Sequence, residues 1–142
     1  MNMYSELKKQ HQNEVNKFPF IFAFSNKQLA EGMAKLGLKE DETKKLISIG
    51  NGGFIRKTDK EAFNEMFNRH EEELKNAIDE DSTGESFIYQ MFDYELNNHE
   101  YCITYEIDDT LDALGLTIDE INNNDKLLHG LRKAIGNQKS CF

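Results

Sequence analysis

Residues 91–110, MFDYELNNHEYCITYEIDDT, bring together many side chains that could do chemistry. These twenty residues include six carboxylates, three tyrosines, one histidine and one cysteine, and they contain no lysine or arginine. Such a set could carry out general acid–base catalysis, bind a metal ion, or form an acidic surface for a basic partner. Each of these three functions needs further residues at a defined spacing. The presence or absence of those residues therefore distinguishes the three functions.

Catalysis would centre on the cluster His99, Glu100 and Tyr101, which supplies an imidazole, a carboxylate and a phenol. No nucleophile motif or orienting pair accompanies this cluster, and the carboxylates around Cys102 disfavour a reactive thiolate. His99 and Cys102 also make up only half of a zinc site, because no second pair of ligands lies at the required spacing. We therefore expect a protein that is not an enzyme and that needs no cofactor. A small enzyme that uses the His99–Tyr101 cluster is the alternative.

A weak calcium motif lies in the loop DEDSTGE at residues 79–85. Its candidate ligands are Asp79, Asp81 and Glu85. If Asp79 is position one, Asp81 and Gly84 fall where an EF-hand places a ligand and its turn glycine. Position twelve, which should be a bidentate glutamate, is Gln90. We therefore expect no metal, and we interpret the loop as a solvated turn between two helices.

The charge of the chain is concentrated in one block. Residues 71–120 carry 16 acidic side chains and a single basic one, Lys75, whereas residues 1–70 carry 12 basic and 9 acidic side chains. A block of this kind repels nucleic acid and attracts cationic protein surfaces. The predicted partner-binding residues are Asp93, Tyr94, Glu95, Glu100, Tyr101, Tyr105, Glu106, Asp108, Asp109 and Asp112. The competing interpretation is an inert, solvated face that keeps the protein soluble.

Hydrophobic periodicity predicts the elements that position these residues. Helices are expected at 4–18, 26–36, 58–78 and 86–98, after Asp108, and over the C-terminal leucines. Strands are expected at 20–24 and 101–107, and a hairpin is expected around Asn51-Gly52-Gly53. The fold class is therefore α+β, with a small sheet of about four strands and five to six helices in a single domain, 1–142. Residues 1–18 form the N-terminal helix of that domain, and residues 136–142 are expected to be a flexible tail.

Two segments repeat the same order of features. FAFSNKQLAEGMAKLGLKEDE (22–42) and TYEIDDTLDALGLTIDE (104–120) each read as a strand, a helix, Leu-Gly-Leu and an acidic turn. The repeat indicates either a duplicated strand–helix unit or one way of ending a helix that is used twice.

Nothing in the sequence directs the chain to a membrane. The longest apolar stretch, around FPFIFAF, is far too short to cross a bilayer, and the N-terminus has no apolar region of the signal-peptide kind. With two widely separated cysteines, a disulfide framework is not expected. We expect a cytoplasmic protein.

Several segments resemble a family of small uncharacterised proteins of phages and other bacterial mobile elements. The resemblance covers roughly residues 18–136. It rests on MFDYELNNHEYCITYE, DTLDALGLTIDEI, FSNKQLAEGMAKLGL and ISIGNGGFI. It implies a binding protein that blocks host machinery in the bacterial cytoplasm. Anti-CRISPR proteins are one such class, and several of them are acidic and occupy the nucleic-acid-binding site of their target.

The leading hypothesis is a non-enzymatic inhibitor that docks its acidic face on a basic, nucleic-acid-binding surface of a host defence protein, specifically a CRISPR effector. This hypothesis expects no direct contact with nucleic acid or membrane. The alternative is an accessory or regulatory protein of a mobile element that acts through a homodimer interface or a small ligand.

Overall fold

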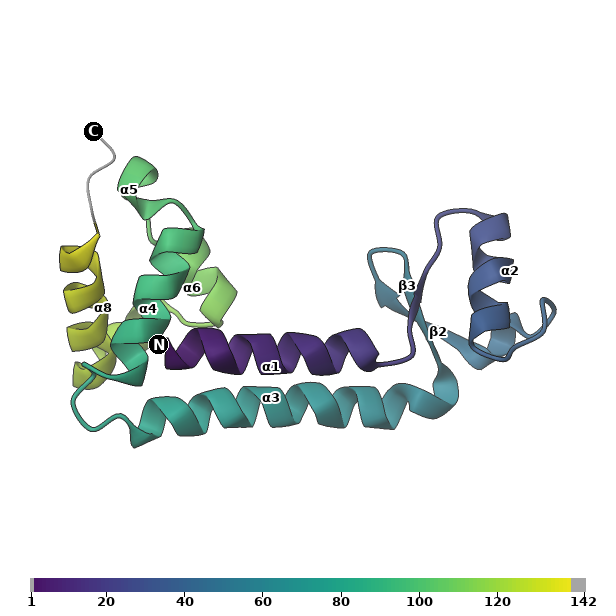
Figure 1. Ribbon diagram of the computed structural model, residues 1–142, viewed down its shortest axis with the longest axis horizontal. Helices are drawn as coiled ribbons and strands as arrows, with labels where there is room; N and C mark the ends of the chain where they lie inside the picture. Colours follow the sequence, from purple (N-terminus) through teal and green to yellow (C-terminus); the bar gives the residue numbers. More distant parts are fainter. Residues whose placement is uncertain (1, 139–142) are drawn as a thin grey trace. The chain divides into compact units, whose positions relative to one another are not determined.

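A computed structural model of the chain describes residues 2–138. Within these residues the chain forms eight α-helices and one three-stranded antiparallel sheet, which confirms the α+β class (Figure 1). The chain divides into two compact units. We call Gln12–Glu71 the sheet unit, and Met1–His11 together with Glu72–Phe142 the helical unit. That the two units act as one domain remains a prediction.

Two long helices belong to both units. The helix α1 (Met3–Lys17) matches the predicted N-terminal helix, and α3 (Lys60–Glu80) matches the helix predicted at 58–78. The boundary between the units falls after His11 in α1 and after Glu71 in α3.

The sheet unit contains the predicted hairpin. Strands β2 (Leu46–Gly50) and β3 (Gly53–Arg56) pair antiparallel, with Ile47 opposite Ile55. Between them, Asn51 and Gly52 have φ values of 52° and 79°, which is the left-handed conformation that a tight hairpin turn needs. Strand β1 (Ile21–Phe22) pairs with the other side of β3, so the strand order is β1-β3-β2. The structure therefore shortens the predicted strand at 20–24 to two residues.

One face of the sheet is covered by α2 (Asn26–Lys35), which begins after its N-cap, Ser25. The hydrophobic cluster between them contains Ile21, Met33, Leu36 and Leu46. A Cβ added to Gly32 would lie only 2.6 Å from Cδ1 of Ile21. Glycine at this position therefore lets α2 approach β1 closely. The sheet unit also contains two 3₁₀ turns, η1 (Thr43–Lys45) and η2 (Lys57–Asp59).

The core of the helical unit is built around α4 (Phe87–Asn98). Four of its apolar side chains have no exposed surface: Ile88, Met91, Phe92 and Leu96. They pack in one hydrophobic cluster with residues from the remaining helices. These helices are α5 (Tyr101–Thr104), α6 (Asp108–Leu114), α7 (Ile118–Asn122) and α8 (Asp125–Asn137). The part of the predicted tail beyond Gln138 lies outside the described residues.

The prediction of a strand at 101–107 is wrong, because residues 101–104 form the one-turn helix α5. The alternation of apolar and polar residues is real, but a strand also needs a partner for its backbone, and the three strands of the described chain pair with one another at residues 21–56. The loss of this strand leaves three strands where about four were predicted. The helices α5 and α7 raise the number from five or six to eight.

The two Leu-Gly-Leu segments end their helices in the same way. Leu38 N–H donates to Met33 O over 2.8 Å, and Leu116 N–H donates to Leu111 O over 3.0 Å. Gly37 and Gly115 lie between these bonded pairs with φ values of 75° and 67°. Both are Schellman caps. Because no strand forms before the second helix, the repeat is one helix-ending motif that is used twice, not a duplicated strand–helix unit.

Two further observations concern membrane-spanning helices and the cysteines. None of the helices in residues 2–138 is both long and apolar enough to cross a membrane. Cys102 is disulfide-bonded, although no disulfide was expected from the sequence. The other cysteine, Cys141, lies outside the described residues.

The close approach of α8 to α4 generates a stability prediction. A Cβ added to Gly130 would lie 2.5 Å from Cγ2 of Ile88 and 2.6 Å from the backbone oxygen of Gly84. Gly130→Ala should therefore destabilise the protein by about 1–3 kcal/mol. The matched control is Gly136→Ala in the same helix, where nothing lies within 4 Å and where alanine should be neutral or stabilising by about 0.5 kcal/mol. Urea denaturation measures both. Equal stability of the two variants would contradict the close packing of α4 and α8.

Candidate partner-binding surface

The short helix α5 is held between two residues in the left-handed conformation. Glu100 before it and Tyr105 after it both have φ of 56°. The left-handed conformation is energetically costly for any residue other than glycine. Strained backbone of this kind is often found at functional sites. The strain turns the chain sharply at both ends of α5 and presents the helix on the surface.

The turn exposes apolar side chains that the alternating pattern would have placed inward. Ile103 is 51% exposed and Tyr105 is 60% exposed. Tyr101 is half-buried, and its ring meets that of Tyr105 edge-on, with 5.9 Å between the ring centroids. Ile103 was not among the predicted partner-binding residues, because a strand with one buried face would have placed its side chain in the core.

The helix α6 adds carboxylates beside these apolar residues. Its buried residues are Thr110, Leu111 and Leu114, and the Thr110 hydroxyl donates to the backbone oxygen of Glu95 over 3.3 Å. The exposed acidic residues of α6 are Asp108, Asp109 and Asp112. Asp108 and Asp109 lie in the first turn, where negative charge is favourable to the helix dipole.

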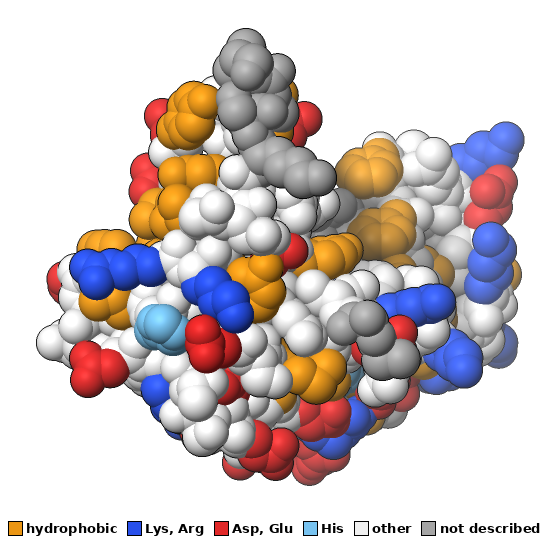
Figure 2. All heavy atoms as spheres, turned by 60° about the vertical axis from the view of Figure 1, so that its left-hand side comes forward, with side chains coloured by type: hydrophobic (Ala, Val, Ile, Leu, Met, Phe, Trp, Pro, Cys, Tyr) orange, Lys and Arg blue, Asp and Glu red, His pale blue; other side chains and the backbone are white. Residues whose placement is uncertain are grey.

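We define the α5–α6 surface by its exposed residues: Glu100, Ile103, Tyr105, Glu106, Asp108, Asp109 and Asp112. It therefore combines five carboxylates with two apolar side chains. In Figure 2, hydrophobic side chains near the top of the view, at the height of α5 in Figure 1, are bordered by Asp and Glu side chains. The arrangement has the apolar anchors and the charge of a protein-binding site.

Four of the predicted partner-binding residues do not belong to this surface: the half-buried Tyr101, and three residues of α4. Glu95 has no exposed surface, so its inclusion in an exposed acidic face is wrong. Asp93 is half-buried and accepts hydrogen bonds from the side chains of Asn137, over 3.3 Å, and Gln138, over 3.0 Å. Tyr94 is half-buried against Tyr4, with 5.5 Å between the ring centroids. The sequence shows that these residues are polar, but the packing of α4 decides that they face inward.

The buried Glu95 is part of a polar cluster inside the helical unit. Its Oε1 lies 2.9 Å from Nζ of Lys8, and its Oε2 lies 3.6 Å from Nε2 of His99. Within residues 2–138, both Oε2 and the His99 Nε2 are buried without a hydrogen-bond partner. Burial, followed by the nearby charge of Glu95, raises the pKa of Tyr4. The Lys8 Nζ also lies over the ring of Tyr94, 5.3 Å from its centroid.

This cluster also bears on the catalytic alternative. His99 interacts with Glu95, one helical turn earlier, whereas Glu100 is exposed and Tyr101 packs on Tyr105. The three residues of the proposed catalytic cluster therefore have separate surroundings. A carboxylate with no exposed surface, such as Glu95, does not reach a substrate unless the core opens. The geometry supports a structural ion pair better than a catalytic site.

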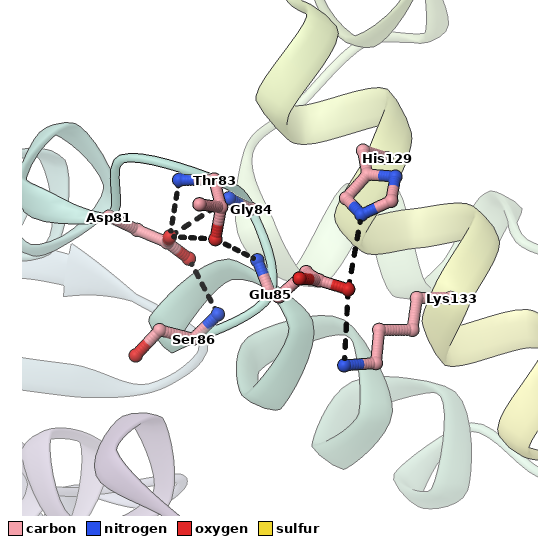
Figure 3. A network of polar contacts seen from close by, with 7 residues as sticks. All are labelled: Asp81, Thr83, Gly84, Glu85, Ser86, His129 and Lys133. Atoms are coloured by element: carbon pink, nitrogen blue, oxygen red, sulfur yellow. Dashed lines mark hydrogen bonds and ion pairs between the residues drawn. The ribbon is translucent and has the colours of Figure 1, made fainter.

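The loop at 79–85 is organised around Asp81, which is only 5% exposed (Figure 3). Its Oδ1 accepts the backbone N–H groups of Thr83 and Gly84, over 3.1 and 2.8 Å. Its Oδ2 accepts those of Ser86 and Ile88, each over 3.0 Å. Burial disfavours the charged form, but the hydrogen bonds from Ile88, Gly84, Thr83 and Ser86 outweigh it and lower the pKa of Asp81.

The other two candidate calcium ligands are used differently. Glu85 points to α8, with Oε1 lying 3.4 Å from Nε2 of His129 and 3.5 Å from Nζ of Lys133 (Figure 3). Asp79 is exposed. In the part of the chain that the structure describes, no group of three or more His, Cys, Asp or Glu side chains could hold a metal ion. The Asp81 carboxylate instead holds the turn between α3 and α4.

A third group of titratable side chains lies in the sheet unit. Glu14 of α1 pairs with Arg69 and with Nε2 of His70 in α3, the latter over 2.8 Å. The hydrogen bond from Arg69, followed by that from His70, lowers the pKa of Glu14 to about 2. Glu14 and Arg69 also line a cavity with Lys17, Phe18 and Met66. Because carboxylate and guanidinium neutralise each other there, the cavity has no dominant charge to select a ligand.

Comparison with known proteins gives one match. Residues 3–137 match the model of a family of unknown function, DUF7659. No curated protein and no solved structure matches the chain.

The ion pair of Glu95 should be important for stability. Lys8→Ala leaves a buried carboxylate without its ammonium partner and should lower the free energy of unfolding by about 2–3 kcal/mol. Lys9→Ala, at the exposed neighbouring position, should change it by less than about 0.5 kcal/mol. Adding Glu95→Gln to Lys8→Ala should recover part of the loss, because the buried charge is then removed as well. Strictly additive effects in this double-mutant cycle, measured by urea denaturation, would show that the pair is not coupled.

The role of Asp81 predicts a pH-dependent difference in stability. Because its folded-state pKa lies below the ordinary value of 3.8, its contribution is complete above about pH 5 and is lost as pH falls through the lowered value. Asp81→Asn leaves backbone N–H groups without acceptors and should cost about 1–3 kcal/mol at pH 7. The gap to the wild type should narrow between pH 5 and pH 3. Asp79→Asn is the control, and a constant gap across this range would refute the assignment.

Proposed function

We propose that this chain, which belongs to the DUF7659 family, is a non-enzymatic binding protein that docks its α5–α6 surface on a basic surface of another protein. The observation that carries the proposal is the exposure of Ile103 and Tyr105 among five carboxylates. Apolar side chains of this size are usually buried unless a partner covers them. The carboxylates then determine the charge of that partner.

The charge of the helical unit also supports a basic partner. It holds 17 acidic and 7 basic side chains, whereas the sheet unit holds 9 acidic and 10 basic ones. A negative potential of this size accelerates the encounter with a cationic surface and orients the two proteins before they touch. The exposed Tyr105 and Ile103 would then supply the apolar centre of the contact, where binding energy is concentrated.

The most strongly basic protein surfaces are those that bind nucleic acid, since they must neutralise a row of phosphates. The carboxylates on either side of α5 and along α6 resemble such a row of charges. The specific form of the proposal is therefore an inhibitor that competes with nucleic acid. Together with the resemblance to proteins of phages and mobile elements, this favours a CRISPR effector as the target.

A capture experiment tests the binding proposal. Tagged protein incubated with a bacterial host lysate at 50 mM salt should retain a basic nucleic-acid-binding protein. At 500 mM salt, where charges are screened beyond about 4–5 Å, retention should fall at least about tenfold. Purified CRISPR effectors, with and without guide RNA, test the specific form through inhibition of DNA binding. Inhibition that persists unchanged at high salt would contradict an electrostatic mimic of nucleic acid.

Matched variants separate the surface from total charge. Asp108→Lys, Asp109→Lys and Asp112→Lys together should abolish binding, and so should Tyr105→Asn, which removes the ring but suits the left-handed backbone. The control reverses three exposed acidic residues of the sheet unit and makes the same change in net charge: Glu40→Lys, Asp41→Lys and Glu61→Lys. Circular dichroism checks that each variant is folded. If the control weakens binding as much as the α6 variant, net charge and not this surface is responsible.

A further inference from the structure

The sheet unit carries a second exposed apolar surface, at the open edge of β1. Phe22 is 57% exposed and Phe24 is 77% exposed, and the rings of Phe20 and Phe22 meet edge-on at 5.3 Å. These phenylalanines line a groove with Gln28, Glu31 and Lys35 of α2. The groove therefore lies between the edge strand β1 and the helix α2.

One residue of β1, Phe22, has its backbone positioned to accept another strand, whereas the N–H of Phe24 already donates to Oε1 of Gln28 over 2.8 Å. Within the part of the chain that the structure describes, β1 pairs with β3 alone. Ala23 N–H donates to Gly52 O over 2.9 Å, and Ile21 is opposite Phe54. In an antiparallel pair, alternate residues bond to the partner strand, so the N–H and C=O of Phe22 point to the open edge. An open edge flanked by exposed aromatic residues is a template for strand addition.

We propose that the occupant of this edge is a second copy of the chain, so that two sheets join through antiparallel β1 strands around a two-fold axis. The charges of the groove favour this partner. Glu31 and Lys35 lie one turn apart on the same side of α2, so antiparallel α2 helices bring Glu31 of one copy to Lys35 of the other. The surface is thus complementary to itself, as a symmetric interface requires.

The net charges of the two units also favour the β1 edge as the dimer interface. The sheet unit has 10 basic and 9 acidic side chains, so two copies approach with almost no net repulsion. The helical unit, with 17 acidic and 7 basic side chains, repels its own copy. Pairing through β1 buries Phe22 on both sides and uses the unit that has almost no net charge. This inference does not depend on the function proposed for the α5–α6 surface.

Sedimentation equilibrium of the full chain tests the proposal. The wild type should dimerise in the micromolar range, and Phe22→Glu should abolish dimerisation by placing two like charges at the two-fold axis. Ile103→Glu, an equally exposed position in the helical unit, is the control and should leave the dimer intact. A wild type that is monomeric at several hundred micromolar would overturn the proposal. So would a dimer that survives Phe22→Glu or one that Ile103→Glu dissociates.

A charge swap provides a second readout that does not touch the strand. Glu31→Lys should weaken the dimer about tenfold, because two ion pairs are replaced by two repulsive pairs. Combining Glu31→Lys with Lys35→Glu should restore the affinity, since the pairs are re-formed with reversed signs. If the single variant and the swap bind equally well, Glu31 and Lys35 do not meet across the axis. If the swap fails to recover the loss, the antiparallel arrangement is wrong.

Discussion

The buried carboxylate of Glu95 is the constraint around which the helical unit is organised. It lies on α4, among side chains with no exposed surface, and must keep a cation beside it to remain charged. Lys8 supplies that cation from α1, while His99 lies at the other oxygen. The ion pair thereby joins the first helix of the chain to a helix some ninety residues later, and the backbone oxygen of Glu95 holds α6 through Thr110. The helix that carries the exposed aspartates is thus anchored to the same residue.

The polar groups of the helical unit therefore fall into two kinds. One kind is buried and serves the protein's own structure: Asp81 accepts backbone N–H groups, and Glu95 pairs with the charge of Lys8. The other kind, on α5 and α6, is exposed and lies beside apolar side chains. In the sequence the two kinds are mixed within a few residues, since Glu95 and Glu100 are only five positions apart. Burial separates a structural carboxylate from one that is available to a partner.

The two proposed interfaces have different physical characters. The α5–α6 surface is strongly acidic, depends on a strained one-turn helix, and fits a basic partner. The β1 edge is nearly neutral, offers backbone hydrogen bonds, and fits a copy of itself. A dimer through β1 would present two acidic surfaces at once. Such an arrangement would increase the avidity for a target that has two basic sites or a long basic channel.

The amino-acid sequence by itself determined the α+β class, the long helices, the hairpin at Asn51-Gly52 and the helix-ending glycine Gly37. These features depend on local periodicity and on residues that tolerate positive φ. Contacts with distant segments of the chain change neither of these local properties. The sequence also located the acidic block, because charge is a property of composition. It could not show that residues 101–104 form a helix, since a strand depends on whether a partner strand lies beside it. Only the tertiary structure decided which carboxylates are buried and which are exposed, because burial depends on contacts between segments far apart in the chain. That is why Glu95 was predicted as a binding residue and Ile103 was not.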